Sequence, residues 1–514
     1  MKGVYFFMDI SLKSEDYKIL KANKTHSVEE IAQAELSLPE YMPDILRIIK
    51  TTAEPKVISC KIIGDRMTVD GACELRMIYT AEDGCIYSFS QTRQFTRHCE
   101  STDFENCVDA NAQIDVLYVN CRATGTKRAE VKAGLKICFN VYFPEAEKII
   151  SVENCEMEKK TSSVEALSSG CRKTRPFSMS DTITLAEPCA FIVGKSANAV
   201  LTEVRKISNK IMLRGEAIVQ ICYVNSENRG LTENVAHSIP INQILEIEGF
   251  QEDFEGNVVL RVNAVDIIPK GEQGNFNTSF DVSLNIDAIV TMWEKKALCL
   301  ISDAYCVDCD IQLKKQEYVF VDSFEELNDT LVCDNSLVVS GEGVGDVLYC
   351  SAEISGIKYG FSGGEITLTG SLDLSLVIRD TANSLTDVSK AFDFSYKKNV
   401  DWKSQSVFCE PEICVNAVKC NVRSSNTIDI RAELCISGYA VGESYVECVT
   451  EITASDTPVK RRSSSVVVYF PDCENENLWN IARRYNTTVS AIAEENGLSG
   501  DTTEKLNVLF IPSP

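Results

Sequence analysis

Two cysteines have a spacing that is typical of reactive or metal-binding thiols. Cys306 and Cys309 form a C-x-x-C motif, a spacing that redox-active dithiols and zinc sites both use. The segment around them, DAYCVDC (303–309), is similar to EALSSGC (165–171), which keeps only the second cysteine. No further C-x-x-C could complete a zinc site. We therefore interpret both thiols as structural and expect neither a metal site nor a cofactor.

Histidine-based catalysis is hard to assemble from this sequence. Its 3 histidines, His26, His98 and His237, are scattered over different segments, whereas a catalytic triad or a metal cluster needs several convergent groups. A phosphate-binding G-x-x-x-x-G-K-[ST] loop is absent from the sequence. We predict that the protein is not an enzyme. One alternative stays open, a hydrolase within a β unit, which would show a deep polar pocket with a perturbed acid pair.

The charge balance argues against one class of partner. The chain has 51 Lys and Arg against 75 Asp and Glu, a formal net charge of -24. Phosphate-rich partners would be repelled, so we expect no nucleic-acid binding. The one compact basic cluster, Lys460 to Arg462, is interpreted as a solvated linker.

Cysteine usage and hydropathy indicate the compartment. The start, MKGVYFFMDISLKSEDYK, has too short an apolar run for a signal peptide, so we expect a cytoplasmic protein. Many of the 22 cysteines, such as Cys73, Cys222 and Cys435, lie in strand-like runs, where a reduced thiol acts as a small buried hydrophobe. No apolar stretch approaches the roughly 18 to 20 residues of a membrane span.

Three similar segments indicate a triplicated β unit. Each is a strand pattern of alternating apolar residues with glycine at its fifth position: MTVDGACELRMIY (67–79), IMLRGEAIVQICY (211–223) and ITLTGSLDLSLVI (366–378). Gly71, Gly215 and Gly370 are thus 144 and 155 residues apart, 299 in all. A glycine inside a strand fits a bulge or a close backbone approach.

A second marker repeats at the same distance. Ala133 in RAEVKAGLKICF and Ala432 in TIDIRAELCISG are also 299 residues apart, and FDVSLNIDAIV (280–290) holds the corresponding place in the middle unit. Turn signals such as Glu82-Asp83-Gly84 indicate antiparallel strands. The sequence therefore predicts a mainly β protein of three tandem antiparallel sandwich or barrel-like repeats.

The repeats divide the chain into five predicted parts. These are a first β repeat with an N-terminal extension (1–164), a second (165–302), a third (303–455), a linker (456–464) and a terminal module (465–514). Within the first part, EEIAQAELSLPEYMPDILRIIK (29–50) is predicted to include a helix.

The terminal module has helical spacing instead of strand alternation. An apolar stripe at i, i+3, i+4 and i+7 predicts one short helix, built from Leu478, Ile481, Ala482 and Tyr485. Asn477 can cap this helix, Thr488 can cap a second one, and Asn496-Gly497 provides a left-handed exit. With strands at 465–470 and 508–511, the module is predicted to be a β-α-α-β unit.

This module resembles a LysM domain. The resemblance rests on Leu478, Trp479, Ile481, Ala482, Tyr485, Ile492, Ala493, Asn496, Gly497, Leu498 and the final Ile511-Pro512. Most LysM domains bind N-acetylglucosamine polymers in a shallow groove between two loops. This copy has Asn475-Glu476-Asn477 where the family usually has Gly-Asp-Thr, and Leu506 where a Gly is usual. Glycan binding is therefore doubtful, and we interpret Trp479 as partly buried and not as a sugar platform.

Three β repeats followed by a LysM module resemble the SipL-like spore-coat morphogenetic proteins. The likeness rests on LPEYMPDI (38–45) and on the strand from Gly71 to Tyr79, with a partial echo in Leu185-Ala186-Glu187-Pro188. It implies a non-catalytic scaffold in spore-coat assembly, working in the mother-cell cytoplasm at the forespore surface. Its LysM module would bind a SpoIVA-like coat ATPase, with other coat proteins as further candidate partners.

The resemblance places the partner surface on the LysM module. The candidate residues are Asn477, Trp479, Arg483, Arg484, Tyr485 and Asn496. A solvated helix face is the alternative interpretation of the two arginines. The alternative function is a cell-wall protein that binds peptidoglycan or chitin-type glycans, with the β repeats as spacers.

Overall fold

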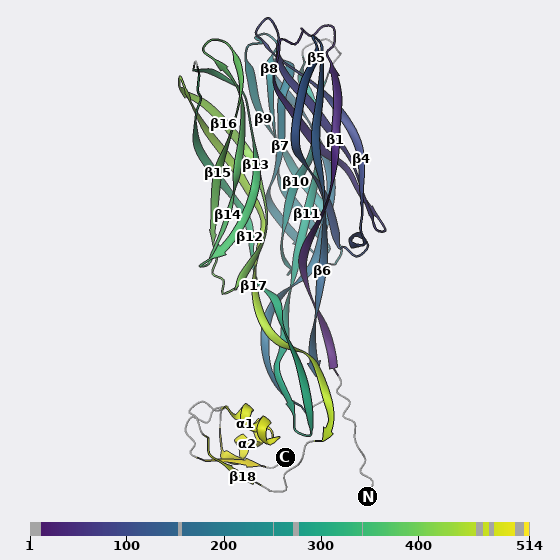
Figure 1. Ribbon diagram of the computed structural model, residues 1–514, viewed down its shortest axis with the longest axis vertical. Helices are drawn as coiled ribbons and strands as arrows, with labels where there is room; N and C mark the ends of the chain where they lie inside the picture. Colours follow the sequence, from purple (N-terminus) through teal and green to yellow (C-terminus); the bar gives the residue numbers. More distant parts are fainter. Residues whose placement is uncertain are drawn as a thin grey trace.

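The computed structural model describes residues 12–152, 157–249, 251–270, 277–341, 343–458, 466–471, 477–498 and 508–512. Over these ranges the chain forms antiparallel sheets and ends in a small β-α-α-β unit, which confirms the predicted fold class. Figure 1 shows an elongated molecule with a wide β body, a narrow stem and the terminal unit near the far end of the stem.

The first repeat, residues 12–152, contains two facing three-stranded sheets. Their strand orders are β1-β6-β5 and β2-β3-β4. A short 3-10 helix (Thr102–Phe104) connects β4 to β5. The strands are β1 (Leu12–Ser37), β2 (Arg47–Ile63), β3 (Arg66–Thr80), β4 (Ile86–Glu100), β5 (Asp109–Gly125) and β6 (Arg128–Val152).

The second repeat (157–306) and the third (309–458) use the same strand order. The third has sheets β12-β17-β16 and β13-β14-β15. In the second, the long β7 pairs with β11 up to Cys189 and with β8 from there on, so both sheets share it. The strands are β7 (Met157–Ile207), β8 (Lys210–Asn225), β9 (Thr232–Glu246), β10 (Glu255–Pro269), β11 (Asn277–Cys306), β12 (Cys309–Val338), β13 (Val344–Ser362), β14 (Glu365–Asp380), β15 (Leu385–Asn399), β16 (Ser406–Ser424) and β17 (Thr427–Pro458).

The repeated glycines lie opposite bulges. Gly71, Gly215 and Gly370 are in the central strands β3, β8 and β14, and the preceding strand changes register beside each one. A Cβ on Gly215 would lie 2.1 Å from the carbonyl oxygen of Val200. In the first and third repeats, the ring of a phenylalanine on the next strand covers the glycine instead. The glycines therefore allow the close approach that the sequence predicted.

The predicted N-terminal helix is wrong. Residues 29–37 continue strand β1, residues 38–46 form a connection, and β2 begins at Arg47. Ala32, Ala34 and Leu36 are buried and alternate with exposed residues, which is the period of a strand and not of a helix. The LPEYMPDI segment is the connection, where the side chain of Lys127 donates hydrogen bonds to the carbonyls of Glu40 and Met42.

The three repeats pack against one another around one axis and are not separate domains along the chain. The equivalent last strands β6, β11 and β17 contact one another. Their side chains share one buried cluster with those of β1, β7 and β12, which includes Tyr17, Trp293 and Phe320. The stem in Figure 1 has its own core at the far ends of β6, β7, β11, β12 and β17, where Ile150, Ile301 and Ile452 are buried together.

A polar cluster around a buried arginine also joins all three repeats. The side chain of Arg172 on β7 is 1% exposed and donates two hydrogen bonds, of 2.8 and 2.6 Å, to Glu410 on β16. Its guanidinium lies 3.6 Å from the ring centroid of Tyr142 on β6. Tyr439 on β17 donates a further hydrogen bond of 2.9 Å to Glu410. Repeats one, two and three therefore each contribute a side chain to one polar cluster.

Strand pairing suggests where one repeat passes to the next. The sequence-based divisions after residues 164, 302 and 455 fall within β7, β11 and β17. We therefore propose divisions between 152 and 157, between 306 and 309, and after 458, where the paired strands end. Most of the predicted linker, including Lys460 to Arg462, lies outside the described residues.

Candidate interaction site

The terminal module folds as its sequence predicts. Strands β18 (Val466–Tyr469) and β19 (Leu509–Pro512) pair antiparallel, with helices α1 (Leu478–Tyr485) and α2 (Val489–Asn496) between them. The N-cap of α1 is Asn477, and the hydroxyl of Thr488 accepts a hydrogen bond of 3.0 Å from the Ala491 amide to cap α2. Gly497 ends α2 with φ +62°, a left-handed conformation that glycine adopts without strain.

Two of the six candidate residues hold the module together. The side-chain oxygen of Asn477 accepts hydrogen bonds from the backbone amides of Trp479 and Asn480. The amide of Asn496 donates to the carbonyl of Phe510 at 2.6 Å and accepts from its N–H at 2.7 Å, which ties α2 to β19. Both side chains therefore have local structural tasks.

Two further candidates connect the module to the stem. The indole Nε1 of Trp479 donates a hydrogen bond of 2.9 Å to the carboxylate of Asp303 near the end of β11. Nη1 of Arg483 is 3.2 Å from the same carboxylate. The ring of Trp479 packs edge-on against Tyr305, with centroids 4.8 Å apart. Trp479 is thus half-buried, and its polar edge is already bonded.

Tyr305 is the main residue of this contact that sequence reasoning missed. It is 3% exposed, belongs to the apolar core of the terminal module, and its hydroxyl donates to the carbonyl of Thr487 at 2.9 Å. The only signal in the sequence was an aromatic residue at a strand end. It could not be assigned to the module because 182 residues separate Tyr305 from Thr487.

The remaining two candidates lie on the other side of α1. Nη1 of Arg484 donates a hydrogen bond of 3.1 Å to the hydroxyl of Tyr469 on β18, and the ring of Tyr485 packs edge-on against the same tyrosine. Large apolar side chains are also exposed on the two strands and just after β18: Val466, Val468, Phe470 and Phe510. Exposed apolar patches of this kind mark interaction surfaces.

The cysteines of the C-x-x-C motif occupy the turn between β11 and β12. Cys306 is buried and half-buried Cys309 has a pKa raised to about 12, chiefly by burial and then by hydrogen bonding to Cys306. The similarity of 165–171 to 303–309 does not reflect equivalent positions, because Cys309 begins β12 where Met157 begins β7. Across the described residues, no group of three or more His, Cys, Asp and Glu side chains could hold a metal ion.

Comparison with known families identifies both parts of the chain. The SipL SPOCS domain model matches residues 44–124 and 191–268, and the LysM domain model matches residues 474–508. The chain is SipL-like and carries a C-terminal LysM domain. No curated protein and no solved structure matches it.

The SPOCS matches correspond to the same strands in two repeats. Residues 44–124 cover β2 to β5, and residues 191–268 cover most of the second half of β7 through β10. The third repeat has the same arrangement in β13 to β16. The SPOCS and LysM families are binding domains and not enzyme families. Among the described residues no helix is long and apolar enough to span a membrane.

A cavity of this SipL-like protein tests the hydrolase alternative. It measures about 890 Å³ and lies where strands of all three repeats meet. Glu54 and Glu74 line it as direct cross-strand partners. Burial raises the pKa of Glu54. Burial by itself would also raise the pKa of Glu74. The charges of Arg76 and Lys195 outweigh burial and lower this pKa to about 2. This pair is perturbed, yet Glu74 is held by Arg76 and Lys195, which favours a structural ion-pair network.

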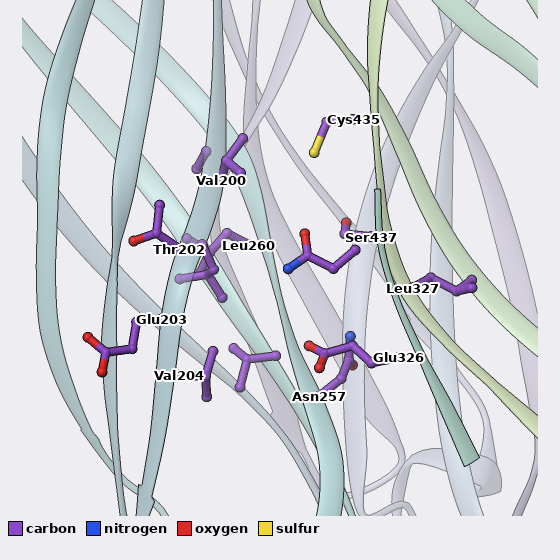
Figure 2. A pocket seen from close by; sticks show the side chains of 14 residues that line it. Val200, Thr202, Glu203, Val204, Asn257, Leu260, Glu326, Leu327, Cys435 and Ser437 are labelled. Atoms are coloured by element: carbon purple, nitrogen blue, oxygen red, sulfur yellow. The ribbon is translucent and has the colours of Figure 1, made fainter. Parts of the chain in front are cut away.

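A smaller pocket between the second and third repeats is no better suited to acid–base chemistry. It measures about 200 Å³ and contains Glu203 on β7 and Glu326 on β12. Figure 2 shows the Glu203 carboxylate pointing away from Glu326. The segment GFSGG (360–364) has the spacing G-x-S-x-G, but it forms the hairpin turn from β13 to β14 and not a strand-to-helix elbow.

Proposed function

We propose that this protein is a non-catalytic scaffold of spore-coat assembly whose LysM domain binds a SpoIVA-like coat ATPase. The match to both the SipL SPOCS and the LysM families carries the proposal. We further propose that it acts in the mother-cell cytoplasm at the forespore surface. The three SPOCS-type repeats would form the rigid part, and the stem would hold the LysM domain away from it.

The environment of Trp479 favours a protein partner over a glycan. A sugar platform needs an open aromatic face and unengaged polar groups, whereas this indole packs on Tyr305 and donates its N–H to Asp303. The sugar-loop residues 475–476 and Leu506 lie outside the described residues. The partner would instead meet Arg484 and the exposed apolar side chains beside β18 and β19, where Val468 and Phe510 are cross-strand neighbours.

A pull-down of the purified full chain tests this function. The full chain should retain the coat ATPase, and a chain that ends at residue 458 should not. Phe510→Ser should weaken retention at least tenfold, because it removes a large side chain from the proposed surface. Ile268→Ser is the matched control, since Ile268 is exposed on β10 in the β body.

The glycan alternative is tested with the same proteins. Sedimentation of the full chain with peptidoglycan or chitin, lost on truncation at residue 458, would favour a cell-wall protein. The scaffold hypothesis expects the chain to stay in the supernatant with both polymers and to bind the ATPase.

A further inference from the structure

The third repeat brings together two thiols that the proposed function does not use. Cys350 on β13 and Cys420 on β16 have Sγ atoms only 2.7 Å apart, although 70 residues separate them in the chain. The two strands belong to different sheets, and they contact each other along one side of the sandwich. A disulfide bond is about 2.04 Å long, so a small movement would bring the two sulfurs into bonding distance.

The other two repeats do not pair thiols at this place. The 299-residue offset places Thr51 at the position of Cys350 and Cys121 at the position of Cys420. Strand pairing agrees, because Thr51 opposes Met77 as Cys350 opposes Leu376. In the first repeat, burial raises the pKa of the Cys121 thiol, and Thr51 opposes that shift. The corresponding positions in the second repeat are Lys195 and Ile267.

Small molecules can reach the two thiols of the third repeat. Both cysteines are half-buried and line a cavity of about 410 Å³ between the second and third repeats. Behind them lies an apolar cluster that includes Leu376 and Ile430. The cavity is wide enough for a small thiol reagent, while the apolar floor holds the two strands at a fixed distance.

We propose that Cys350 and Cys420 form an intramolecular disulfide when the chain meets a small-molecule disulfide such as oxidised glutathione. One protein thiol loses its proton, and its sulfur attacks the reagent's S–S bond. This releases one reduced thiol and leaves a mixed disulfide. The second protein thiolate then attacks the protein sulfur and releases the other thiol. Two protein thiols are oxidised, the reagent is reduced by two electrons, and its two thiols take up the two protons.

The bond would join the two sheets of the third repeat. Closing a chain loop lowers the entropy of the unfolded state, so oxidised protein should melt at a higher temperature. Hydrogen bonding to Cys420 and burial raise the pKa of Cys350. Because the thiolate is the attacking species, the reaction should accelerate as the pH rises.

Peptide mapping of the full chain tests the proposal. The protein is incubated with reduced or oxidised glutathione, quenched with an alkylating agent, digested and analysed by mass spectrometry. We expect a Cys350–Cys420 linked peptide to be the most abundant cross-link of the oxidised sample and to vanish on reduction. The melting midpoint should rise by several degrees in parallel.

Two variants serve as matched controls. Cys350→Thr copies the pair of the first repeat, and should abolish both the linked peptide and the rise in melting midpoint. Cys121→Ser should leave both unchanged. The peptide map of the wild-type protein tests for the disulfide directly, so the proposal stays testable even if Cys350→Thr folds poorly. A map dominated by Cys306–Cys309 or Cys414–Cys435, or by stable glutathione adducts on Cys350 and Cys420, would overturn the proposal.

Discussion

At the scale of single residues, buried charges in this protein join its repeats. Glu74 in the first repeat accepts a hydrogen bond of 2.7 Å from Lys195 in the second, and it also pairs with Arg76. Burial alone would raise the pKa of Glu74, but the two cations outweigh it and lower that pKa from 4.5 to about 2. Glu74 is therefore ionised at neutral pH, and its ionised form stabilises the folded state.

The lowered pKa of Glu74 predicts a specific acid sensitivity. Its contribution should be complete above pH 4.5 and should disappear as the pH falls toward about 2. A shift of this size corresponds to about 3 kcal/mol of stability. Urea unfolding at pH 6 should show Glu74→Gln destabilised by about this amount, with the difference from wild type shrinking at pH 3. Equal differences at both pH values would contradict this account, and Glu82→Gln, at an exposed carboxylate, is the control.

At the scale of elements, the repeated glycines predict which strand positions resist a side chain. Gly215→Ala would push a Cβ against the backbone of β7, and we expect a loss of about 1 to 3 kcal/mol from overpacking. Gly360→Ala is the control, because a Cβ there meets no atom within 4 Å. Its effect should stay within about 0.5 kcal/mol. Chemical denaturation measures both, and similar losses would contradict the close-approach interpretation of Gly215.

The contact between the LysM domain and the stem predicts a second effect at this scale. Asp303→Ala removes the acceptor that both Trp479 and Arg483 use. The domain should then dock less firmly, so amide hydrogen exchange should rise in α1 and around Tyr305 while the β body stays protected. The control is Asp334→Ala on β12, which removes an exposed ion-pair partner of Arg431 on β17. Unchanged exchange in α1 would show that Asp303 does not hold the domain.

The elements also show what sequence patterns can predict. The triplication and the β-α-α-β module followed from local spacing, because glycines, caps and helical stripes act within a few residues. The sequence predicts a helix within residues 29–50, but Ala32, Ala34 and Leu36 alternate with exposed residues, as in a strand. The contact of Trp479 with Asp303 could not be predicted, because no local pattern records a contact across 176 residues.

At the scale of the whole molecule, the three repeats form one unit. In many tandem arrays each repeat contacts only its neighbours, and stability is close to a sum of local terms. Here β6, β11 and β17 all meet, and the cluster of Arg172, Glu410 and Tyr142 takes one side chain from each repeat. Loss of one repeat's packing therefore exposes the buried surface of the other two.

This arrangement predicts cooperative unfolding that depends on Arg172. Calorimetry of the full chain should show one main transition for the β body. Arg172→Met leaves the half-buried Glu410 carboxylate without its cation, which should cost about 1 to 3 kcal/mol, and it should broaden or split that transition because the repeats uncouple. Arg431→Met removes an exposed pair of similar chemistry and should shift stability by less than about 1 kcal/mol. Three resolved transitions in the wild type would mean that the repeats fold independently. The cluster around Arg172 would then be a contact between domains that fold separately.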